Sequence, residues 1–261
     1  MGVLNVTPDS FFDGGRYHDR AAAIARGRQM VTEGADIVDV GGESTRPGAA
    51  PVGEAEELAR VLPVVEALAP LVTVSIDTTK PRVALEAVAH GARIVNDVSS
   101  TLAHVAAEAG AVFVAMHRKG TPATMQEDPR YDDVVAEVAE YLASRAEQAR
   151  ALGVGEIWVD PGIGFGKTAR HNLTLLAHLE DIVALGYPVL VGTSRKAFLG
   201  RVAAGTLDGP ALPVEERFEG SLASAVWAMA KGARAVRVHD VSATAQAARL
   251  VAEVDLAGAL G

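Results

Sequence analysis

The segment AAAIARGRQMVTEGADIVDVGGESTRPG, residues 21–48, contains one complete structural unit followed by a polar loop. Residues 21–33 are rich in Ala and long polar side chains, which favour a helix, and Gly34 stands where a helix needs a left-handed C-terminal cap. Residues 35–40 form a short, mostly apolar run without regular alternation, which is typical of a parallel strand buried on both faces. A helix joined by a tight glycine turn to a buried strand is the repeating unit of α/β proteins.

The same unit recurs on both sides of this segment, and we count eight alternations of strand and helix. The predicted strands are residues 1–6, 35–40, 71–76, 92–96, 111–116, 156–160, 187–192 and 233–238. The predicted helices are residues 21–33, 54–69, 80–90, 101–109, 131–152, 172–185, 215–231 and 242–254. Several of these helical runs are followed by a glycine that we expect to be a left-handed cap: Gly34, Gly91, Gly110, Gly153, Gly186 and Gly232.

Eight alternations in 261 residues predict an α/β fold, a (β/α)8 TIM barrel in which residues 1–261 form a single domain. The turns that lead into the strands are short and the loops that follow the strands are longer, as in a barrel whose functional loops leave one face. An open, doubly wound sheet explains the alternation as well. The count of eight and the polar residues after nearly every strand favour a closed barrel.

The composition narrows the possible chemistry. Hydrophobic residues make up 49% of the chain and charged residues 22%, which predicts a large core and a compact fold. The absence of Cys excludes disulfides, zinc–thiolate sites and a cysteine nucleophile. The formal net charge of -9 argues against nonspecific nucleic-acid binding. Because no apolar run is long enough for a membrane span and no targeting pattern opens the sequence, we expect a cytoplasmic protein without a membrane partner.

Polar side chains collect at the carboxyl ends of the predicted strands, which meet at one mouth in a barrel. They are Asn5, Thr7, Asp9, Asp39, Glu43, Thr45, Arg46, Asp77, Asn96, Asp97, His117, Arg118, Asp160, Ser194, Arg195, Lys196, Arg237, His239 and Asp240. Structural roles are open for some of them: Asp77 and Asp240 can cap the following helices, and Asp160 can be a turn residue. Together they nevertheless predict a binding site at the mouth.

Two glycine-containing segments follow strands but do not match nucleotide-binding motifs. Residues 160–168, DPGIGFGKT, have Pro161 where a phosphate-binding loop needs its first Gly, and they lack the GxGxxG frame. We expect these glycines to admit a flat ligand close to the backbone. Residues 192–196, GTSRK, offer hydroxyl, guanidinium and ammonium donors where barrels often bind phosphate, and no GxSxG elbow of a serine hydrolase is present.

The segments at the strand ends identify a resemblance over nearly the whole chain. They are GVLNVTPDSF (2–11) with DGG (13–15), DVGGESTRPG (39–48), Asp77, Asn96-Asp97, Met116-His117, DPGIGFGK (160–167), GTSRK (192–196) and RVHDV (237–241). In this order they resemble the dihydropteroate synthases. The resemblance implies a transferase of folate biosynthesis, a sulfonamide target, that condenses 6-hydroxymethyl-7,8-dihydropterin diphosphate with 4-aminobenzoate to give 7,8-dihydropteroate and diphosphate.

The resemblance also implies a set of binding residues. The pterin would be held by Asp77, Asn96, Val98, Met116, Asp160, Gly192 and Lys196, and the diphosphate by Asn5, Arg46, Arg237 and His239. The 4-aminobenzoate would contact Thr45, Arg46, Pro47, Phe165, Lys196 and Ala197. Asp13, Lys196, Arg237 and His239 would be catalytic, with Asp13 stabilising a cationic pterin methylene. Mg²⁺ is the implied cofactor, with Asn5 as its protein ligand and the diphosphate and water completing its shell.

Three positions depart from the family pattern: Phe12 stands where Ser is usual, Arg118 where Met is frequent, and Ala197 where Ser often follows the lysine. Phe12 and Ala197 bear on the shape of the 4-aminobenzoate and sulfonamide pocket. Two alternatives remain for the sequence: a barrel that binds reduced pterins for methyl transfer, and a catalytically silent pterin-binding paralogue. The partners implied are the two small substrates and a second copy of the chain, in a homodimer formed through helices on the outside of the barrel.

Overall fold

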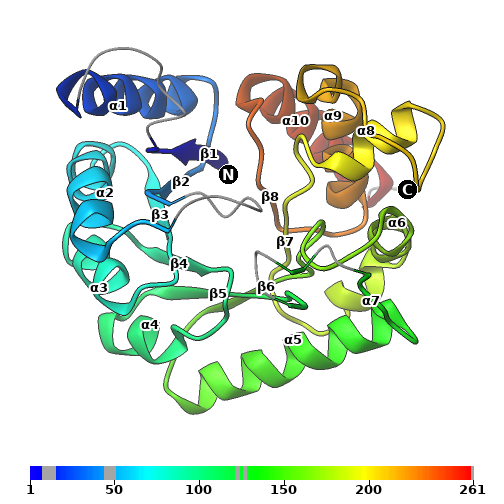
Figure 1. Cartoon of the computed structure of the whole chain (residues 1–261), viewed down its shortest axis with the longest axis horizontal. Coiled ribbons are helices and arrows are strands. Elements are labelled where there is room, and N and C mark those ends of the chain that lie inside the picture. Colours follow the sequence, from blue (N-terminus) through cyan, green and yellow to red (C-terminus); the bar gives the residue numbers. More distant parts are fainter. Residues whose placement is uncertain (8–15, 44–50, 121–123, 126–127, 260–261) are drawn as a thin grey trace.

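The computed structural model describes residues 1–7, 16–43, 51–120, 124–125 and 128–259, and it is a ring of strands surrounded by helices (Figure 1). The strands are β1 (Gly2–Asn5), β2 (Ile37–Gly41), β3 (Thr73–Asp77), β4 (Ile94–Asp97), β5 (Val112–Met116), β6 (Ile157–Asp160), β7 (Leu190–Val191) and β8 (Ala235–Val236). Each lies inside or within one residue of a predicted strand.

The ring is closed. Strands β1 to β6 form one parallel sheet in chain order, and β7 pairs in parallel with β8. Single parallel bridges join the two sheets, from Val159 to Val189 and from Gly2 to Val238. At the second seam the amide of Val3 donates to the carbonyl of Val238 over 2.9 Å. The predicted (β/α)8 barrel is therefore confirmed, because an open sheet would leave the first strand unpaired on one side.

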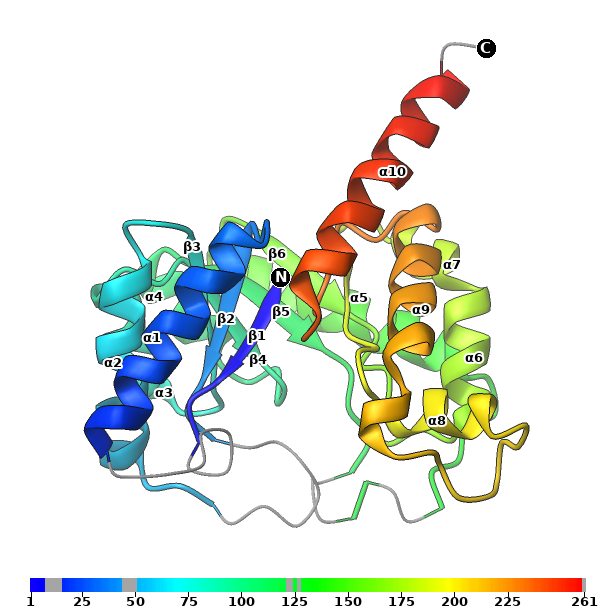
Figure 2. The same cartoon turned by 90° about the horizontal axis from the view of Figure 1, so that it is seen from above.

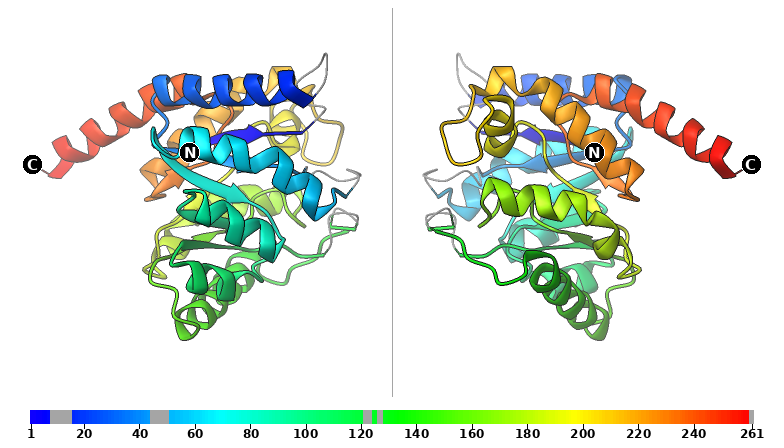
Figure 3. Two further views of the ribbon diagram at one scale, coloured as in Figure 1. Left: turned by 90° about the vertical axis from the view of Figure 1, so that its left-hand side faces the viewer. Right: turned by 90° about the vertical axis from the view of Figure 1, so that its right-hand side faces the viewer.

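Helices cover the outside of the ring, as Figure 3 shows from two sides. They are α1 (Arg16–Thr32), α2 (Glu54–Leu68), α3 (Pro81–Ala89), α4 (Ala103–Ala109), α5 (Val134–Ala151), α6 (Ala169–Ala177), α7 (Leu179–Val183), α8 (Ala197–Ala203), α9 (Phe218–Ala230) and α10 (Val241–Ala259), with a 3-10 turn at Val214–Glu216. Figure 2 shows α10 extending well beyond the other helices. None of the described helices has the length and apolar character that a membrane crossing requires.

The helix prediction was wrong in two places. The predicted helix 172–185 is two helices, since His178 leaves helical geometry at φ −108° and ψ 29° between α6 and α7. Helix α8 was missed because its seven residues directly follow the segment that we interpreted as a binding loop. The six glycine caps were correct: their φ angles lie between 65° and 112°, in the left-handed region.

Successive residues of each strand face opposite sides of the barrel wall, and this alternation separates the core from the site. The outward side chains, such as Val95, Phe113 and Val191, pack in the large core between strands and helices. The inward side chains Ile94, Val114 and Leu190 form a separate small cluster. Two residues further along the same strands, the inward positions reach the carboxyl ends and are Asn96, Met116 and Gly192, three of the residues proposed for the pterin.

Candidate active site

Inward-facing polar side chains from neighbouring strands meet at the mouth of the barrel. Asp39 comes from β2, Asp77 from β3 and Asn96 from β4, and the strand register pairs Asp77 with Asn96. Asp160 ends β6, and Arg237 follows β8 directly. The sequence prediction that these distant residues assemble at one end of the barrel is thus consistent with their positions in the fold.

Arg237 is the hub of this cluster. Its Nε atom donates to Asp39 Oδ2 over 2.6 Å, and its Nη2 atom donates to Asp77 Oδ2 over 2.7 Å. Asn96 Nδ2 also donates to Asp39 Oδ2, over 3.0 Å, so one buried oxygen holds two site residues. The second oxygen, Asp39 Oδ1, is buried without a hydrogen-bond partner. Arg237 is therefore held in place by carboxylates before any ligand binds.

One guanidinium pairs with two carboxylates in this arrangement. The cluster therefore has more negative than positive charge, which affects the pKa values of its members. Burial raises the pKa of Asp77 to about 7; the positive charge of Arg237 opposes the shift, and the neighbouring carboxylates Asp39, Asp97 and Glu57 reinforce it. Burial opposes the charge of Arg237, but Asp39, Asp77 and Asp160 together raise its pKa, so it stays charged. Asp77 makes no helix cap: α3 begins after Lys80, and no side chain caps its N-terminus.

Lys196 follows β7, the strand that pairs with β8. Its Nζ atom donates to the carbonyl oxygen of Ile163 and lies 4.5 Å from the centre of the Phe165 ring, within cation–π distance. Burial lowers the pKa of Lys196 to about 8, although the negative charge of Asp160 opposes the shift. Burial likewise raises the pKa of Asp160, against the effect of Lys196. A buried acid and a buried base therefore stand close together at the mouth.

The glycine-rich loop between β6 and α6 brings Ile163 and Phe165 to Lys196. Gly162, Gly164 and Gly166 have φ angles of 64°, 84° and 63°, which side chains other than glycine adopt only under strain. Asp160 Oδ1 accepts a hydrogen bond of 2.7 Å from the amide of Gly162, so its expected turn role is present beside its place at the mouth. The backbone of this loop therefore packs closely against the neighbouring segments.

Gly162 shows how tight this packing is, and it provides a stability prediction. A Cβ atom at Gly162 would lie 1.8 Å from the carbonyl oxygen of His117. We expect Gly162→Ala to lower the free energy of unfolding by about 3 kcal/mol, through backbone strain and a forced shift of the loop. Gly186→Ala is the matched control, because Gly186 also has positive φ, at 80°, but has no atom within 4 Å of its Cβ position. Denaturant unfolding measures both; equal losses would contradict the packing argument.

The remaining groups proposed for the diphosphate stand at β1 and β8. Asn5 ends β1, half-buried, and His239 follows β8. His239 Nδ1 lies 2.9 Å from Ser194 Oγ, which also accepts from the amide of His239 over 3.2 Å. These contacts fix the imidazole relative to the loop after β7. The side chain of Asp240, expected as a helix cap, pairs with Arg195 over 2.7 Å.

The apolar residues proposed for the pterin slot lie at the ends of β4, β5 and β7, and Ser100 fixes the backbone of one of them. Val98 and Met116 are buried at the ends of β4 and β5. Ser100 Oγ donates to the carbonyl of Met116 over 2.8 Å and accepts from its amide over 2.7 Å. Gly192 lies between Arg237 and Lys196: a Cβ there would lie 3.7 Å from Arg237 Cβ and 4.0 Å from Lys196 Nζ. Only a small residue leaves this gap open.

Four predicted site residues, Asp13, Thr45, Arg46 and Pro47, lie outside the described residues. Ala197 is described, and it is exposed at the start of α8. Near the end of β2, Lys80 Nζ donates to both Glu43 and the fully buried Glu57, and Glu43 in turn accepts from the amide of Val52 over 3.0 Å.

The strand-end motifs include Asp39, His117 and Lys167, but no contact with a substrate was predicted for these three residues. Asp39 holds Arg237 and Asn96, and Lys167 is buried behind the glycine-rich loop, with Nζ 2.8 Å from His117 Nδ1. The sequence signal for Asp39 was its position in the strand: it faces the inside of the barrel, as Asp77 and Asn96 do near the ends of the next two strands. No sequence signal separates Lys167 from an ordinary loop lysine. Asp97, by contrast, accepts from the amides of Thr101 and Leu102 in the turn directly before α4.

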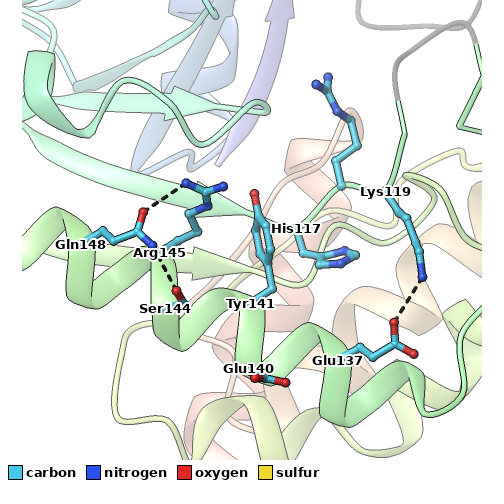
Figure 4. Close-up of a pocket in the computed structure, with 9 residues that line it drawn as sticks. His117, Lys119, Glu137, Glu140, Tyr141, Ser144, Arg145 and Gln148 are labelled. Atoms are coloured by element: carbon cyan, nitrogen blue, oxygen red, sulfur yellow. Dashed lines mark hydrogen bonds and ion pairs between the residues drawn. The ribbon is translucent and has the colours of Figure 1, made fainter.

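A separate hollow of about 490 Å³ lies over α5, beside the end of β5 (Figure 4). It is lined by His117, Arg118, Lys119, Glu137, Glu140, Tyr141, Ser144, Arg145 and Gln148. Figure 4 shows Lys119 directed at Glu137, 3.2 Å away, and Arg145 at Gln148. None of the residues predicted to bind substrate lines this hollow, so it is distinct from the cluster at the barrel mouth. Arg118, which departs from the family pattern, belongs to it.

Comparison with known proteins agrees with the strand-end motifs. The family model described as pterin binding enzyme matches residues 1–239. The dihydropteroate synthase of Escherichia coli is 47% identical over 259 residues, covering 96% of this chain and 89% of that protein. The Yersinia pestis dihydropteroate synthase, solved in complex with a sulfonamide drug, has a TM-score of 0.89 and 42% identity, covering 97% of this chain and 93% of that one.

The Thermus thermophilus dihydropteroate synthase, solved with 4-aminobenzoate, has a TM-score of 0.85 and 44% identity over 97% of this chain and 93% of that one. Fold, strand-end residues and similarity over nearly the full length all agree. The chain therefore belongs to the pterin-binding enzymes, and among them to the dihydropteroate synthases.

Proposed function

We infer that residues 1–261 form one pterin-binding barrel domain that condenses 6-hydroxymethyl-7,8-dihydropterin diphosphate with 4-aminobenzoate. The bond between the pterin methylene carbon and the diphosphate oxygen breaks, and the amine nitrogen forms a bond to the same carbon. The amine loses one proton, and the products are 7,8-dihydropteroate and diphosphate. The chain is a transferase of the pterinylmethyl group in folate biosynthesis.

The observation that carries this inference is the mixed set of donors and acceptors at the mouth. The edge of a pterin ring presents both hydrogen-bond donors and acceptors, and Asp160, Asn96 and Asp77 offer oxygens to its donors. Lys196 offers an ammonium to its acceptors, and Val98 and Met116 supply apolar walls. Charge-assisted hydrogen bonds of this kind contribute roughly 1.5 to 3 kcal/mol each.

The leaving diphosphate requires positive charge and hydrogen-bond donors on the β1 and β8 side of the mouth. Arg237 and His239 are placed there, and Arg46 belongs to the proposed set. Among the described residues no group of three or more acidic or histidine side chains could hold a metal ion. Asn5 offers one neutral oxygen, which suits Mg²⁺ whose other ligands are water and diphosphate oxygens. Bound there, Mg²⁺ would neutralise charge that develops on the leaving diphosphate.

The 4-aminobenzoate site is proposed beside Lys196. Phe165 and Lys196 lie within 4.5 Å of one another and offer an aromatic face and a cation for the benzoate. Thr45, Arg46, Pro47 and Ala197 complete the proposed set. Asp13 would stabilise the cationic pterin methylene, so that the amine attacks after the diphosphate has begun to leave. Sulfonamides are expected to compete with 4-aminobenzoate at this site.

The reaction is tested by measuring diphosphate release from the pterin diphosphate in the presence of Mg²⁺, with and without 4-aminobenzoate, and with Lys196→Ala. We expect release that depends on the amine, yields dihydropteroate and is lost in the variant. Pterin binding without release would instead favour a silent pterin-binding paralogue or a methyl-transfer barrel.

The pH dependence of kcat/KM follows from the buried lysine. Burial lowers the pKa of Lys196 from 10.5 to about 8, so the ammonium is fully present well below pH 8 and is lost as the pH rises through that value. We expect kcat/KM to fall above pH 8, because kcat/KM reports ionisations of the free enzyme. In Lys196→Arg the side chain stays charged, so a lower but flat alkaline profile is expected. An identical alkaline fall in both proteins would assign the ionisation to another group.

A homodimer through the outer helices is the proposed assembly. Apolar side chains are exposed on α9 and α10: Trp227 is 49% exposed, Leu250 67% and Val254 61%. We expect Leu250→Glu to convert a dimer to a monomer in light scattering coupled to size-exclusion chromatography. Leu152→Glu, at an equally apolar position that is 54% exposed just after α5, is the control and should leave the assembly unchanged. If the wild type, Leu250→Glu and Leu152→Glu are all monomers, the proposed homodimer is wrong.

A further inference from the structure

Lys167 is a buried cation that makes no ion pair with a carboxylate among the described residues. Its residue is 2% exposed, and four neutral acceptors surround Nζ. The carbonyl oxygens of Gly162 and Phe165 lie 3.0 and 3.1 Å away, the carbonyl oxygen of His117 lies 3.4 Å away, and His117 Nδ1 lies 2.8 Å away. An ammonium has three hydrogens to donate, so this cage satisfies it fully.

The imidazole of His117 is suited to accept. Burial and the nearby ammonium of Lys167 lower the pKa of His117 to about 3, so the ring is neutral at physiological pH. A neutral ring carries one proton, and with that proton on Nε2 the Nδ1 atom accepts from Lys167. Burial also lowers the pKa of Lys167, to about 7, because desolvation disfavours the charged form. The contacts of Nζ with three loop carbonyls and with His117 hold this side chain in one place.

The cage links the two ends of the segment that faces Lys196. Gly162 and Phe165 are tied to Lys167 by their carbonyls, and Ile163 lies between them. The carbonyl of Ile163 accepts from Lys196, and the ring of Phe165 lies against the same ammonium. Lys167 thus binds the carbonyls of Gly162 and Phe165, while the carbonyl of Ile163 and the ring of Phe165 contact Lys196.

The same segment is also fixed by close packing against Lys119 and Lys196. A Cβ at Gly166 would lie 2.2 Å from the carbonyl of Lys119, and one at Gly164 would lie 2.8 Å from Lys196 Cδ. The amide of Gly164 donates to Asn172 Oδ1 over 2.7 Å, which fastens the loop to α6. The Lys167 cage adds a buried side-chain tie to these contacts and to the backbone hydrogen bond of 3.0 Å from the amide of Phe165 to the carbonyl of Gly162.

We propose that Lys167 is a positioning residue: its ammonium gathers the carbonyls of the glycine-rich loop and thereby holds Ile163 and Phe165 against Lys196. This role rests on the proposed function, in which Phe165 offers 4-aminobenzoate an aromatic contact and Lys196 offers it a charged one. The Lys167 ammonium contacts His117 and loop carbonyls, and none of the side chains assigned to a substrate. Its removal should therefore affect the amine substrate more than the pterin.

The test is Lys167→Met, which keeps the length and most of the volume of the side chain but cannot donate. We expect KM for 4-aminobenzoate to rise about tenfold, while KM for the pterin diphosphate changes less than threefold. Amide hydrogen exchange, followed by mass spectrometry, should accelerate in residues 162–167 and not in the rest of the barrel. Lys231→Met is the control, because Lys231 is remote from the mouth: it pairs with Glu180 at 2.9 Å and its ammonium lies 5.5 Å from the centre of the Trp227 ring.

A double-mutant cycle with Phe165→Leu separates positioning from a general loss of stability. If Lys167 acts through Phe165, Lys167→Met should raise KM for 4-aminobenzoate less than threefold in the Phe165→Leu background. Equal tenfold effects in both backgrounds, or equal losses for both substrates, would overturn the proposal. If the wild-type chain releases no diphosphate, the proposed function fails, and the exchange measurement still decides whether Lys167 holds the loop. Unchanged exchange in residues 162–167 would then reject it.

Discussion

Arg237→Met is expected to reduce diphosphate release about 1000-fold and to lower the free energy of unfolding by about 3 kcal/mol. The loss of activity follows from removing a fixed cation where the leaving group develops charge. The loss of stability follows from the two carboxylates, Asp39 and Asp77, that Arg237 bridges at 2.6 and 2.7 Å. Steady-state kinetics and denaturant unfolding measure the two effects in the same preparation.

Two further variants separate the causes. Arg237→Lys keeps the charge but cannot donate to both carboxylates in the same planar geometry, so we expect intermediate losses. Combining Arg237→Met with Asp39→Asn removes one unpaired carboxylate, so it should recover part of the stability and none of the activity. A stable and active Arg237→Met protein would show that neither the ion network nor the charge at this point matters.

Lys196→Met is expected to lower kcat/KM for 4-aminobenzoate by 100- to 1000-fold, which is about 3 to 4 kcal/mol of transition-state stabilisation. The variant loses the ammonium, its contact with Phe165 at 4.5 Å and the positive charge beside Asp160. The effect on stability should be small by comparison, because burial of this lysine is itself unfavourable: its folded-state pKa is depressed.

The pH dependence of stability tests the expected small effect of Lys196→Met on stability separately from its large effect on activity. Between pH 8 and 10.5 the unfolded chain binds more protons at Lys196 than the folded chain does, so this residue makes stability rise with pH in that window. In Lys196→Met the rise should be smaller. Activity within threefold of wild type would remove Lys196 from the reaction, and a collapse of stability would assign it a structural role instead.

The barrel was predictable because its local signals agree with one another. Alanine-rich helical runs, glycine caps such as Gly34 and Gly91, and short buried strands each follow from local backbone and side-chain preferences. The failures also have local causes. His178 interrupts a run that reads as one helix, and α8 is a short helix within a segment whose residues read as a ligand loop.

The sequence by itself determined the order of the elements and the strand ends at which the polar residues stand. Its motifs also showed the resemblance to the dihydropteroate synthases. Asp77, Asn96, Asp160, Lys196 and Arg237 were all named from it. Their pairing was decided only by the tertiary structure, because closing the barrel brings residues such as Asp39 and Arg237, separated by 198 positions, into contact. The cage around Lys167 has the same origin: three of its acceptors are backbone carbonyls and the fourth is a buried imidazole, and backbone carbonyls leave no trace in a sequence.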